Sequence, residues 1–294
     1  MRNLKISRYC IKFKALTAIH LPEYAGSALR GAFGHALKSI ACLTASRNRG
    51  ICSCQPVASC LYRQLFDPSK REISTLSQVQ DIPPPFVIEP YGLPTHIQTE
   101  EVAYFNMLII GDMAHLQLVL IQLAWQRALH DGIGLKRENA QRGSAILIHM
   151  ENVSQPEPAP RNPGNLQLDL LSPLRLAERG KLIQPDTLDV AVLFKALIRR
   201  IGVLAELHGQ PLTLDYLELN RHIAQLKMEK QLGWMDWFRY SSRQKQDMPL
   251  GGLVGSIKLQ AVSDELWQLI YIGQWMHVGK NTVFGLGHYQ VTPI

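Results

Sequence analysis

Four of the five cysteines in this sequence are crowded into residues 42–60, in the spacing C-x9-C-x-C-x5-C. Crowded cysteines in a reducing compartment favour metal binding over disulfides, and four thiolates suit a tetrahedral zinc ion. The C-x-C step departs from the commoner C-x2-C arrangement, so reduced, buried cysteines are the alternative. The pattern predicts a structural metal, zinc ahead of an iron–sulfur cluster, bound by Cys42, Cys52, Cys54 and Cys60.

A glycine-rich segment near the C-terminus, GKNTVFGLGHYQV, covers residues 279–291. Glycines let the backbone approach a phosphate closely, and consecutive N–H groups beside a lysine can hold the anion. A simple turn that ends a helix is the alternative, and His277 before the loop suits a capping role at that helix end. We expect a phosphate-binding loop over 279–287, with the candidate contacts Gly279, Lys280, Asn281, Gly285 and Gly287.

Residues 235–255 interleave aromatic and basic side chains. Single-stranded RNA is bound by such mixtures, because aromatic rings and guanidinium groups stack on bases while cations attract phosphates. Alternatively, the aromatic residues belong to the core and the cations are solvated. The candidate RNA contacts in this segment are Arg239, Tyr240, Arg243 and Lys245.

The composition narrows the class of protein. The chain has 294 residues, 46% of them hydrophobic, and a formal net charge of +7. It can therefore form a substantial core, and the charge favours a partner with many phosphates over a small anionic metabolite. No apolar run reaches the roughly 18 residues of a membrane span, and the N-terminus lacks a signal-peptide core, so we expect a cytoplasmic protein that does not bind membranes.

The elements that must position these segments follow a regular order in the first half. Residues 9–14 alternate as a half-buried strand, and the next helix has an apolar stripe of Leu29, Phe33, Leu37 and Ile40. Another face of that helix carries Gly31, His35, Lys38 and Cys42. Two strands, a helix and a closing strand are then expected at 83–90, 101–111, 115–130 and 143–153.

The second half repeats this order after a proline-rich linker at residues 154–165. Its expected elements are a strand, a helix ending at Gly209, a hairpin pair, a helix and a last strand, with a polar insertion after the first helix. The sequence therefore predicts an α+β protein of two tandem ferredoxin-like (RRM-like) domains, at 1–153 and 166–294. One larger α+β domain with an inserted loop is the alternative.

Four segments together resemble the RAMP superfamily of CRISPR-associated proteins, and in particular its repeat-cleaving endoribonucleases. GKNTVFGLGHYQV is similar to the C-terminal glycine-rich loop of the superfamily, and RYSSRQ followed by GGLVG is similar to the hairpin of the repeat-cleaving enzymes. SPLRLAERGKL resembles the strand that opens their second domain, and AGSALRGAFGHAL resembles their first helix. The resemblance covers both halves of the chain.

That resemblance implies binding of CRISPR repeat RNA and cleavage by attack of a ribose 2′-hydroxyl on the adjacent phosphate. The products would carry 2′,3′-cyclic phosphate and 5′-hydroxyl ends. No metal or other cofactor would be needed in catalysis, because the nucleophile is already in the substrate and the protein must only orient it, move protons and stabilise charge.

His35 is the first candidate for proton transfer, because the family commonly places a catalytic residue on the first helix and Lys38 follows one turn along. Lys38 would stabilise the transition-state phosphate, and Tyr24 or His20 would orient the nucleophile. Arg30 on the same helix is a candidate RNA contact. A solvated helix histidine without a role is the alternative for His35.

The leading hypothesis is a metal-independent endoribonuclease that produces guide RNA, with repeat RNA and other CRISPR effector subunits as partners. A non-catalytic RAMP subunit that binds guide RNA in an effector complex is the alternative. A zinc-stabilised RNA-binding module unrelated to CRISPR is a third possibility, which would make the four resemblances coincidental. A usable proton-transfer residue beside the RNA distinguishes the first two.

Overall fold

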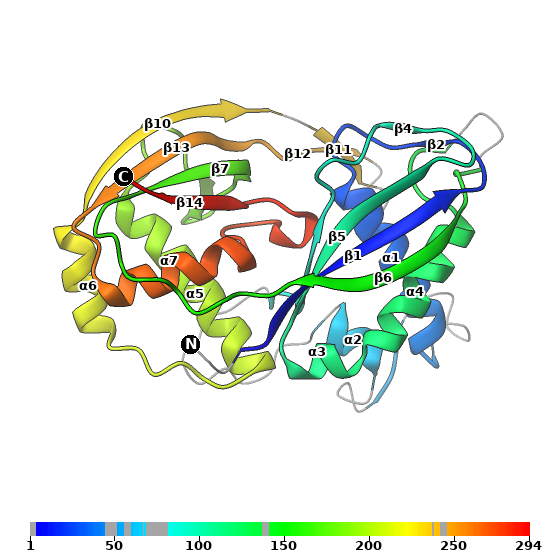
Figure 1. Ribbon diagram of the computed structural model, residues 1–294, viewed down its shortest axis with the longest axis horizontal. Helices are drawn as coiled ribbons and strands as arrows, with labels where there is room; N and C mark the ends of the chain where they lie inside the picture. Colours follow the sequence, from blue (N-terminus) through cyan, green and yellow to red (C-terminus); the bar gives the residue numbers. More distant parts are fainter. Residues whose placement is uncertain are drawn as a thin grey trace. The chain divides into compact units, whose positions relative to one another are not determined.

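The computed structural model describes residues 4–44, 52–55, 60–66, 68, 82–136, 141–236, 238–241 and 246–294. Its chain forms two compact units, Leu4–Gln155 and Pro156–Ile294, each with its own four-stranded sheet (Figure 1). The two units are described separately below.

In the first unit the antiparallel sheet has the strand order β3-β5-β1-β6. Helix α1 (Gly26–Ala41) connects β1 to β3, and helix α4 (Leu118–Asp131) connects β5 to β6. The strands are β1 (Ile6–Ala15), β3 (Phe86–Glu89), β5 (Val102–Ile110) and β6 (Ala145–Ser154). Shorter elements are β2 (Ile19–His20), α2 (Leu61–Leu65), β4 (His96–Ile97) and α3 (Asp112–Leu116).

Aromatic side chains fill the space between the first sheet and its helices. The Trp125 ring on α4 lies 4.9 Å from the Phe33 ring on α1 and 4.7 Å from the Phe105 ring on β5. Leu29, Phe33 and Leu37 are fully buried, as the stripe on α1 predicts. Ile40 is 41% exposed, so this part of the prediction is wrong; at that end of the helix the buried side chain is Cys42 instead.

The pairing of β1 with β6 is interrupted twice. The register shifts between Arg8 and Tyr9 and again between Lys12 and Phe13. On β6 the residues left without a partner are Ile148 and Val153. Each shift is a β-bulge, which bends the strand and increases its twist.

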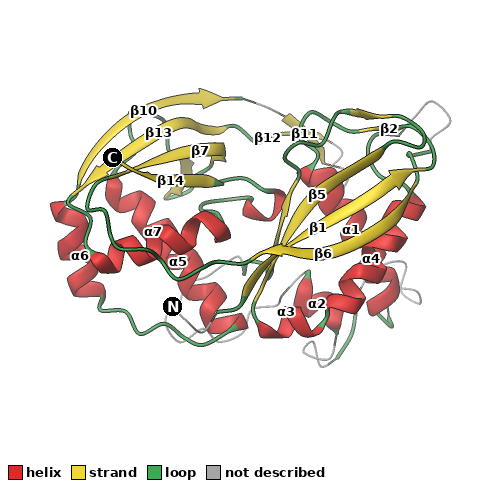
Figure 2. Ribbon diagram, viewed as in Figure 1, coloured by secondary structure: helices red, strands yellow, loops and turns green. Residues whose placement is uncertain are grey.

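The second unit repeats the strand order of the first, as β10-β13-β7-β14. Helix α5 (Val190–His208) follows β7, and helix α7 (Asp264–Met276) connects β13 to β14. The strands are β7 (Leu166–Leu174), β10 (Lys227–Met235), β13 (Gly252–Gln260) and β14 (Tyr289–Pro293). In each unit the two connecting helices lie on one face of the sheet (Figure 2). The prediction of two tandem ferredoxin-like domains is confirmed.

Additional short elements belong to the second unit. They are β8 (Ala177–Glu178), β9 (Lys181–Leu182), α6 (Tyr216–Gln225), β11 (Phe238–Ser241), β12 (Gln246–Pro249) and the 3-10 helix η2 (Thr282–Phe284). Helix α6 lies in the segment that the sequence indicates only as a polar insertion. The Asp215 carboxylate caps α6 by accepting hydrogen bonds from the N–H groups of Leu217 and Glu218.

Helix α7 is fixed at both ends. The Ser263 hydroxyl accepts from the Leu266 N–H, and Asp264 and Glu265 occupy the first turn, where carboxylates complement the helix dipole. At the other end, the buried Arg200 of α5 donates through Nε to the Met276 carbonyl at 2.7 Å. In the described part of the chain, no helix has the length and apolar character of a membrane span.

Candidate functional site

His35 projects from α1 on the side opposite to the buried stripe and is exposed to solvent. Next to it, no atom within 4 Å would contact a Cβ atom placed on Gly31. An open approach to an exposed histidine is what proton transfer to a large substrate requires. The structure therefore leaves His35 accessible, in agreement with its expected face.

The two cations of α1 are held by aromatic rings from α2 and the residue after it. The Arg30 guanidinium lies 4.2 Å from the centre of the Phe66 ring, and the Lys38 ammonium lies 5.2 Å from the centre of the Tyr62 ring. The two rings stack on each other with centres 5.5 Å apart. Cation–π contacts at such distances contribute about 0.5–1 kcal/mol at exposed sites. Arg30 and Lys38 are thus oriented, and the sequence indicated neither contact.

Tyr24 and His20 both precede the helix that carries His35, as expected, with His20 on β2 and Tyr24 in the following loop. Tyr24 lies in the loop just before α1, whereas His35 lies in the middle of the helix. Burial raises the pKa of the Tyr24 phenol, which suits a structural role better than one at the nucleophile.

His20 is instead paired with a histidine that the sequence analysis did not single out. It lies on β2 opposite His96 of β4, with the ring centres 4.8 Å apart in an edge-to-face arrangement. Both side chains are exposed. Because β2 and β4 are each two residues long, they carry too little periodicity for the pairing to be found from sequence.

The glycine-rich loop is folded tightly against β7. The N–H of Lys280 donates to the Arg175 carbonyl at 2.7 Å, and the N–H of Gly287 donates to the Pro173 carbonyl at 3.0 Å. Gly285 closes η2 through a bond from its N–H to the Thr282 carbonyl at 2.8 Å. These three amides are therefore committed within the protein, and the expected phosphate cradle cannot use them.

Two glycines of this loop are required by its shape. Gly279 and Gly287 have φ angles of 94° and 71°, and a Cβ atom at either position would collide with a backbone carbonyl oxygen, of Arg175 or Val278. Asn281 also has a positive φ, of 61°, which asparagine tolerates better than most residues. The Lys280 side chain is exposed, so it remains a candidate contact for an anion.

Two histidines flank this loop and stack on each other. The rings of His277 and His288 are 4.6 Å apart and inclined by only 5°. His277 follows α7 directly, and its Nδ1 donates to the Leu286 carbonyl at 3.2 Å. His277 thus ends α7, as expected, but its ring bonds to the loop rather than to the helix.

The aromatic and basic segment continues a long hairpin of the second unit. Strands β10 and β13 pair up to Met235 and Gly252, and β11 then pairs with β12 from Phe238 and Pro249. The expected hairpin is therefore present. Among its candidate RNA contacts, Arg239 and Tyr240 lie on β11, whereas Arg243 and Lys245 lie outside the described residues.

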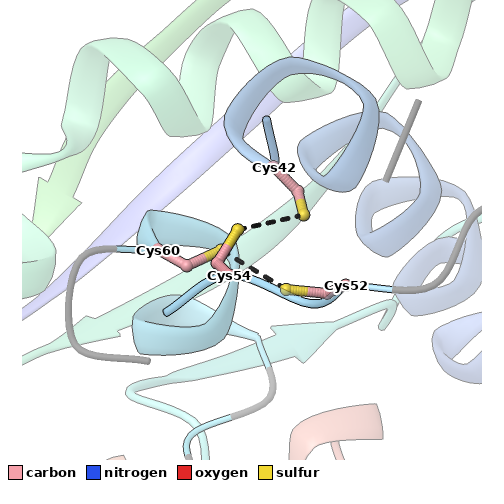
Figure 3. Close-up of side chains that lie close together, drawn as sticks. All are labelled: Cys42, Cys52, Cys54 and Cys60. Carbon is pink, nitrogen blue, oxygen red and sulfur yellow. Dashed lines mark hydrogen bonds between the residues drawn. The ribbon is translucent and has the colours of Figure 1, made fainter. Parts of the chain in front are cut away.

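The four clustered cysteines of the first unit point toward one another (Figure 3). The Sγ atoms of Cys42 and Cys54 are 3.8 Å apart, and those of Cys52 and Cys60 are 3.7 Å apart. All four sulfurs lie within 4.8 Å of one another. Burial alone would raise the pKa of the Cys42 thiol, but hydrogen bonds with Thr44 and the neighbouring cysteines outweigh it and lower the pKa to about 6.

Two models of known protein families together match nearly the whole chain. Residues 4–161, more than half of the chain, match the model of the AF_1859 N-terminal domain, and residues 168–289 match the model of the CRISPR-associated endoribonuclease Cas6. Among proteins of curated function, no sequence matches this chain.

Solved structures of the same fold include several CRISPR proteins. A Thermus thermophilus Cas6 is 14% identical, with a TM-score of 0.53 over 98% of this chain and 99% of that one. Its product complex is also 14% identical, with a TM-score of 0.56 over 99% of both chains. A RAMP protein binding different RNA substrates is 12% identical, with a TM-score of 0.50 over 97% and 99%. A partial Cas6-RT-Cas1–Cas2 complex is 12% identical, with a TM-score of 0.54 over 98% of this chain and 46% of that one.

Two ferredoxin-like units, with a glycine-rich loop before the last strand of the second, are the fold that this chain shares with these solved structures. The chain belongs to the family whose N-terminal domain the first model describes, and it is a CRISPR-associated RAMP protein of the repeat-processing type.

Proposed function

We propose that this chain binds CRISPR repeat RNA and cleaves it at one phosphodiester by attack of the neighbouring 2′-hydroxyl, producing guide RNA. The match of residues 168–289 to the Cas6 endoribonuclease model is the observation that carries the proposal. The formal net charge of +7 supports it, because a polyanionic substrate is attracted to a basic protein.

His35 moves a proton in the proposed reaction. The 2′-oxygen forms a bond to phosphorus as it loses its proton, and the bond from phosphorus to the 5′-oxygen breaks as that oxygen gains one. The products are a 2′,3′-cyclic phosphate and a 5′-hydroxyl. His35 is suited to either transfer, because it is exposed and an imidazole has one nitrogen that can accept a proton and another that can donate one.

Lys38 and Arg30 supply positive charge along the same helix. Lys38 lies three residues after His35, on neighbouring positions of the helix surface, where its ammonium can stabilise the negative charge that develops on the phosphorane. Arg30 contacts a phosphate further along the RNA. Both side chains already rest on aromatic rings, so less rotamer freedom is lost when RNA binds.

The second unit contributes RNA contacts in the proposal. The exposed Lys280 binds a phosphate beside the glycine-rich loop. Arg239 and Tyr240 on β11, together with Arg243 and Lys245 of the same segment, supply cations for phosphates and a ring for base stacking. A Cas6 within a Cas6-RT-Cas1–Cas2 complex supports the further expectation that the chain associates with other CRISPR proteins.

No metal takes part in the proposed cleavage. The nucleophile belongs to the substrate, and two-metal nucleases hold their ions with clustered carboxylates. Among the residues whose placement is described, no group of three or more close ligand-bearing side chains contains two carboxylates. The cysteine group supplies no carboxylate for such a site either.

The decisive experiment incubates the purified protein with labelled repeat RNA in excess EDTA and identifies the product ends. We expect cleavage to persist, with a cyclic phosphate on the 5′ fragment, and to stop when the ribose 5′ of the scissile phosphate is 2′-deoxy. Loss of cutting in EDTA while the RNA stays bound, or normal cutting of the deoxy substrate, would refute the mechanism.

A non-catalytic RAMP subunit is the second candidate function. It is favoured by one observation, namely the same fold in a RAMP protein binding different RNA substrates, at a TM-score of 0.50 and 12% identity. Tight binding of repeat RNA without any cleavage in the same experiment would select this candidate.

A further inference from the structure

The four clustered cysteines come from three separate segments of the first unit, and their sulfur atoms lie close together. Cys42 directly follows the last residue of α1, Cys52 and Cys54 lie in the connecting segment, and Cys60 directly precedes α2. Cys42 and Cys60 are buried, with 4% and 3% exposure, while the other two are half-buried. Cysteines from three segments converge on one point far more readily when something binds them than when each merely packs.

The spacing of the sulfurs identifies what fits between them. Four sulfurs bound at about 2.3 Å to a central zinc ion at tetrahedral corners lie about 3.8 Å apart. Two of the pairs here are 3.8 Å and 3.7 Å apart, and all four sulfurs lie within 4.8 Å of one another. A disulfide would need about 2.05 Å, and all four cysteines are free. A multi-iron cluster would hold its cysteines further apart than one ion does, because irons and sulfides lie between them.

Thr44 provides a second, independent observation. Its Oγ1 accepts the N–H of Ser53 at 2.9 Å, so its own proton is directed elsewhere. The same oxygen lies 3.4 Å from the sulfur of Cys54 and 3.6 Å from that of Cys42. A hydroxyl beside ligand sulfurs can donate its proton to a thiolate, and such outer contacts orient and stabilise the ligands around a metal.

We propose that Cys42, Cys52, Cys54 and Cys60 bind one zinc ion, and that the ion positions α2 against α1. Helix α2 has only five residues, too few to be stable alone, and its first turn begins at the ligand Cys60. Tyr62 and Phe66, which hold Lys38 and Arg30, follow within two turns. The metal therefore acts on RNA through the placement of two rings and two cations. This second part rests on the proposed function.

The zinc itself is tested without RNA. Metal analysis of the protein purified without chelators should find about one zinc per chain. Cys52→Ser/Cys54→Ser should lose it, whereas Cys10→Ser should keep it, because Cys10 lies on β1 outside the group. Replacement with Co²⁺ should give the visible absorption of tetrahedral thiolate coordination. A metal-free native protein, iron in place of zinc, or equal metal in all three proteins would overturn the assignment.

The positioning role is tested by a double-mutant cycle with uncleavable deoxy-substituted repeat RNA. Cys52→Ser/Cys54→Ser should weaken binding by about tenfold, the scale of one charge-assisted contact. In an Arg30→Ala/Lys38→Ala background, the same cysteine changes should weaken binding no further. Additive losses would show that zinc acts elsewhere and would overturn this part. Absence of RNA binding by the native protein would refute the proposed function. The metal analysis would still show whether the four cysteines bind zinc.

Discussion

Replacing His35 with alanine separates catalysis from folding. We expect single-turnover cleavage of repeat RNA to slow by about 10²- to 10⁴-fold, which is about 3–5 kcal/mol of transition-state stabilisation. Binding of uncleavable deoxy-substituted RNA should change little, because a proton-transfer group contributes mainly in the transition state.

The fold should not suffer from this substitution. His35 is exposed in the middle of α1, where truncating a side chain changes the free energy of unfolding by no more than about 0.5 kcal/mol. Alanine also has a helix propensity about 0.5 kcal/mol better than that of histidine. Denaturant unfolding should therefore show a stability equal to or slightly above that of the native protein, so a slow variant cannot be explained by misfolding.

Two other histidines provide controls. His130 on α4 has a side chain that is 80% exposed and lies 3.5 Å from an Asp131 carboxylate oxygen, so His130→Ala should cleave at the native rate. His20→Ala tests the alternative catalytic position, with its partner His96. If His35→Ala cleaves at the native rate, His35 is not the proton-transfer residue. If His20→Ala is the slow variant, the proton-transfer residue is His20 on β2.

Three further substitutions test other parts of the structure. Lys280→Ala should weaken RNA binding and reduce the slope of log affinity against log salt by about one contact, measured by titration at several salt concentrations; an unchanged slope would exclude a phosphate contact. Gly287→Val should lower the free energy of unfolding by at least about 2 kcal/mol in denaturant, because its Cβ would meet the Val278 carbonyl at a positive φ; native stability would contradict the loop geometry. Gly34→Val should displace the Phe66 ring, because the ring occupies the space that the new Cβ atom needs. RNA binding should then weaken while circular dichroism shows that α1 stays helical. Unchanged affinity would show that this ring does not support RNA binding.

Much of the fold could be predicted from the sequence because it is encoded in local periodicity. The alternation in β1 and the apolar stripe of α1 reflect burial on one side only, and the same order of elements recurs in the second half. Helix α6 could not be predicted, because the sequence around it is polar and only two of its side chains, Leu219 and Ile223, are buried. Ile40 fits the helical period yet is 41% exposed, because periodicity alone does not show which side chains of other elements cover each turn of a helix.

The candidate site could be predicted only in part, since its contacts join residues distant in sequence. The pattern of α1 is enough to place His35 on the open face. That Lys38 rests on Tyr62, or that His20 faces His96, depends on the path of loops that have no period. The sequence indicates the glycine-rich C-terminal loop. In the structure, its glycines allow the loop to pack closely against β7, and they do not leave backbone amides free for a phosphate.

The two interruptions in the pairing of β1 with β6 have a consequence for the protein in concentrated solution. Strand β6 is the outermost strand of its sheet, and its exposed Ile146, Ile148 and Val153 would make a straight edge attractive to a strand of another molecule. Ile148 and Val153 are the very residues that the bulges insert. Because each insertion kinks the line of backbone donors and acceptors, β6 offers no regular template for a fifth strand, and its apolar side chains can stay at the surface without promoting aggregation.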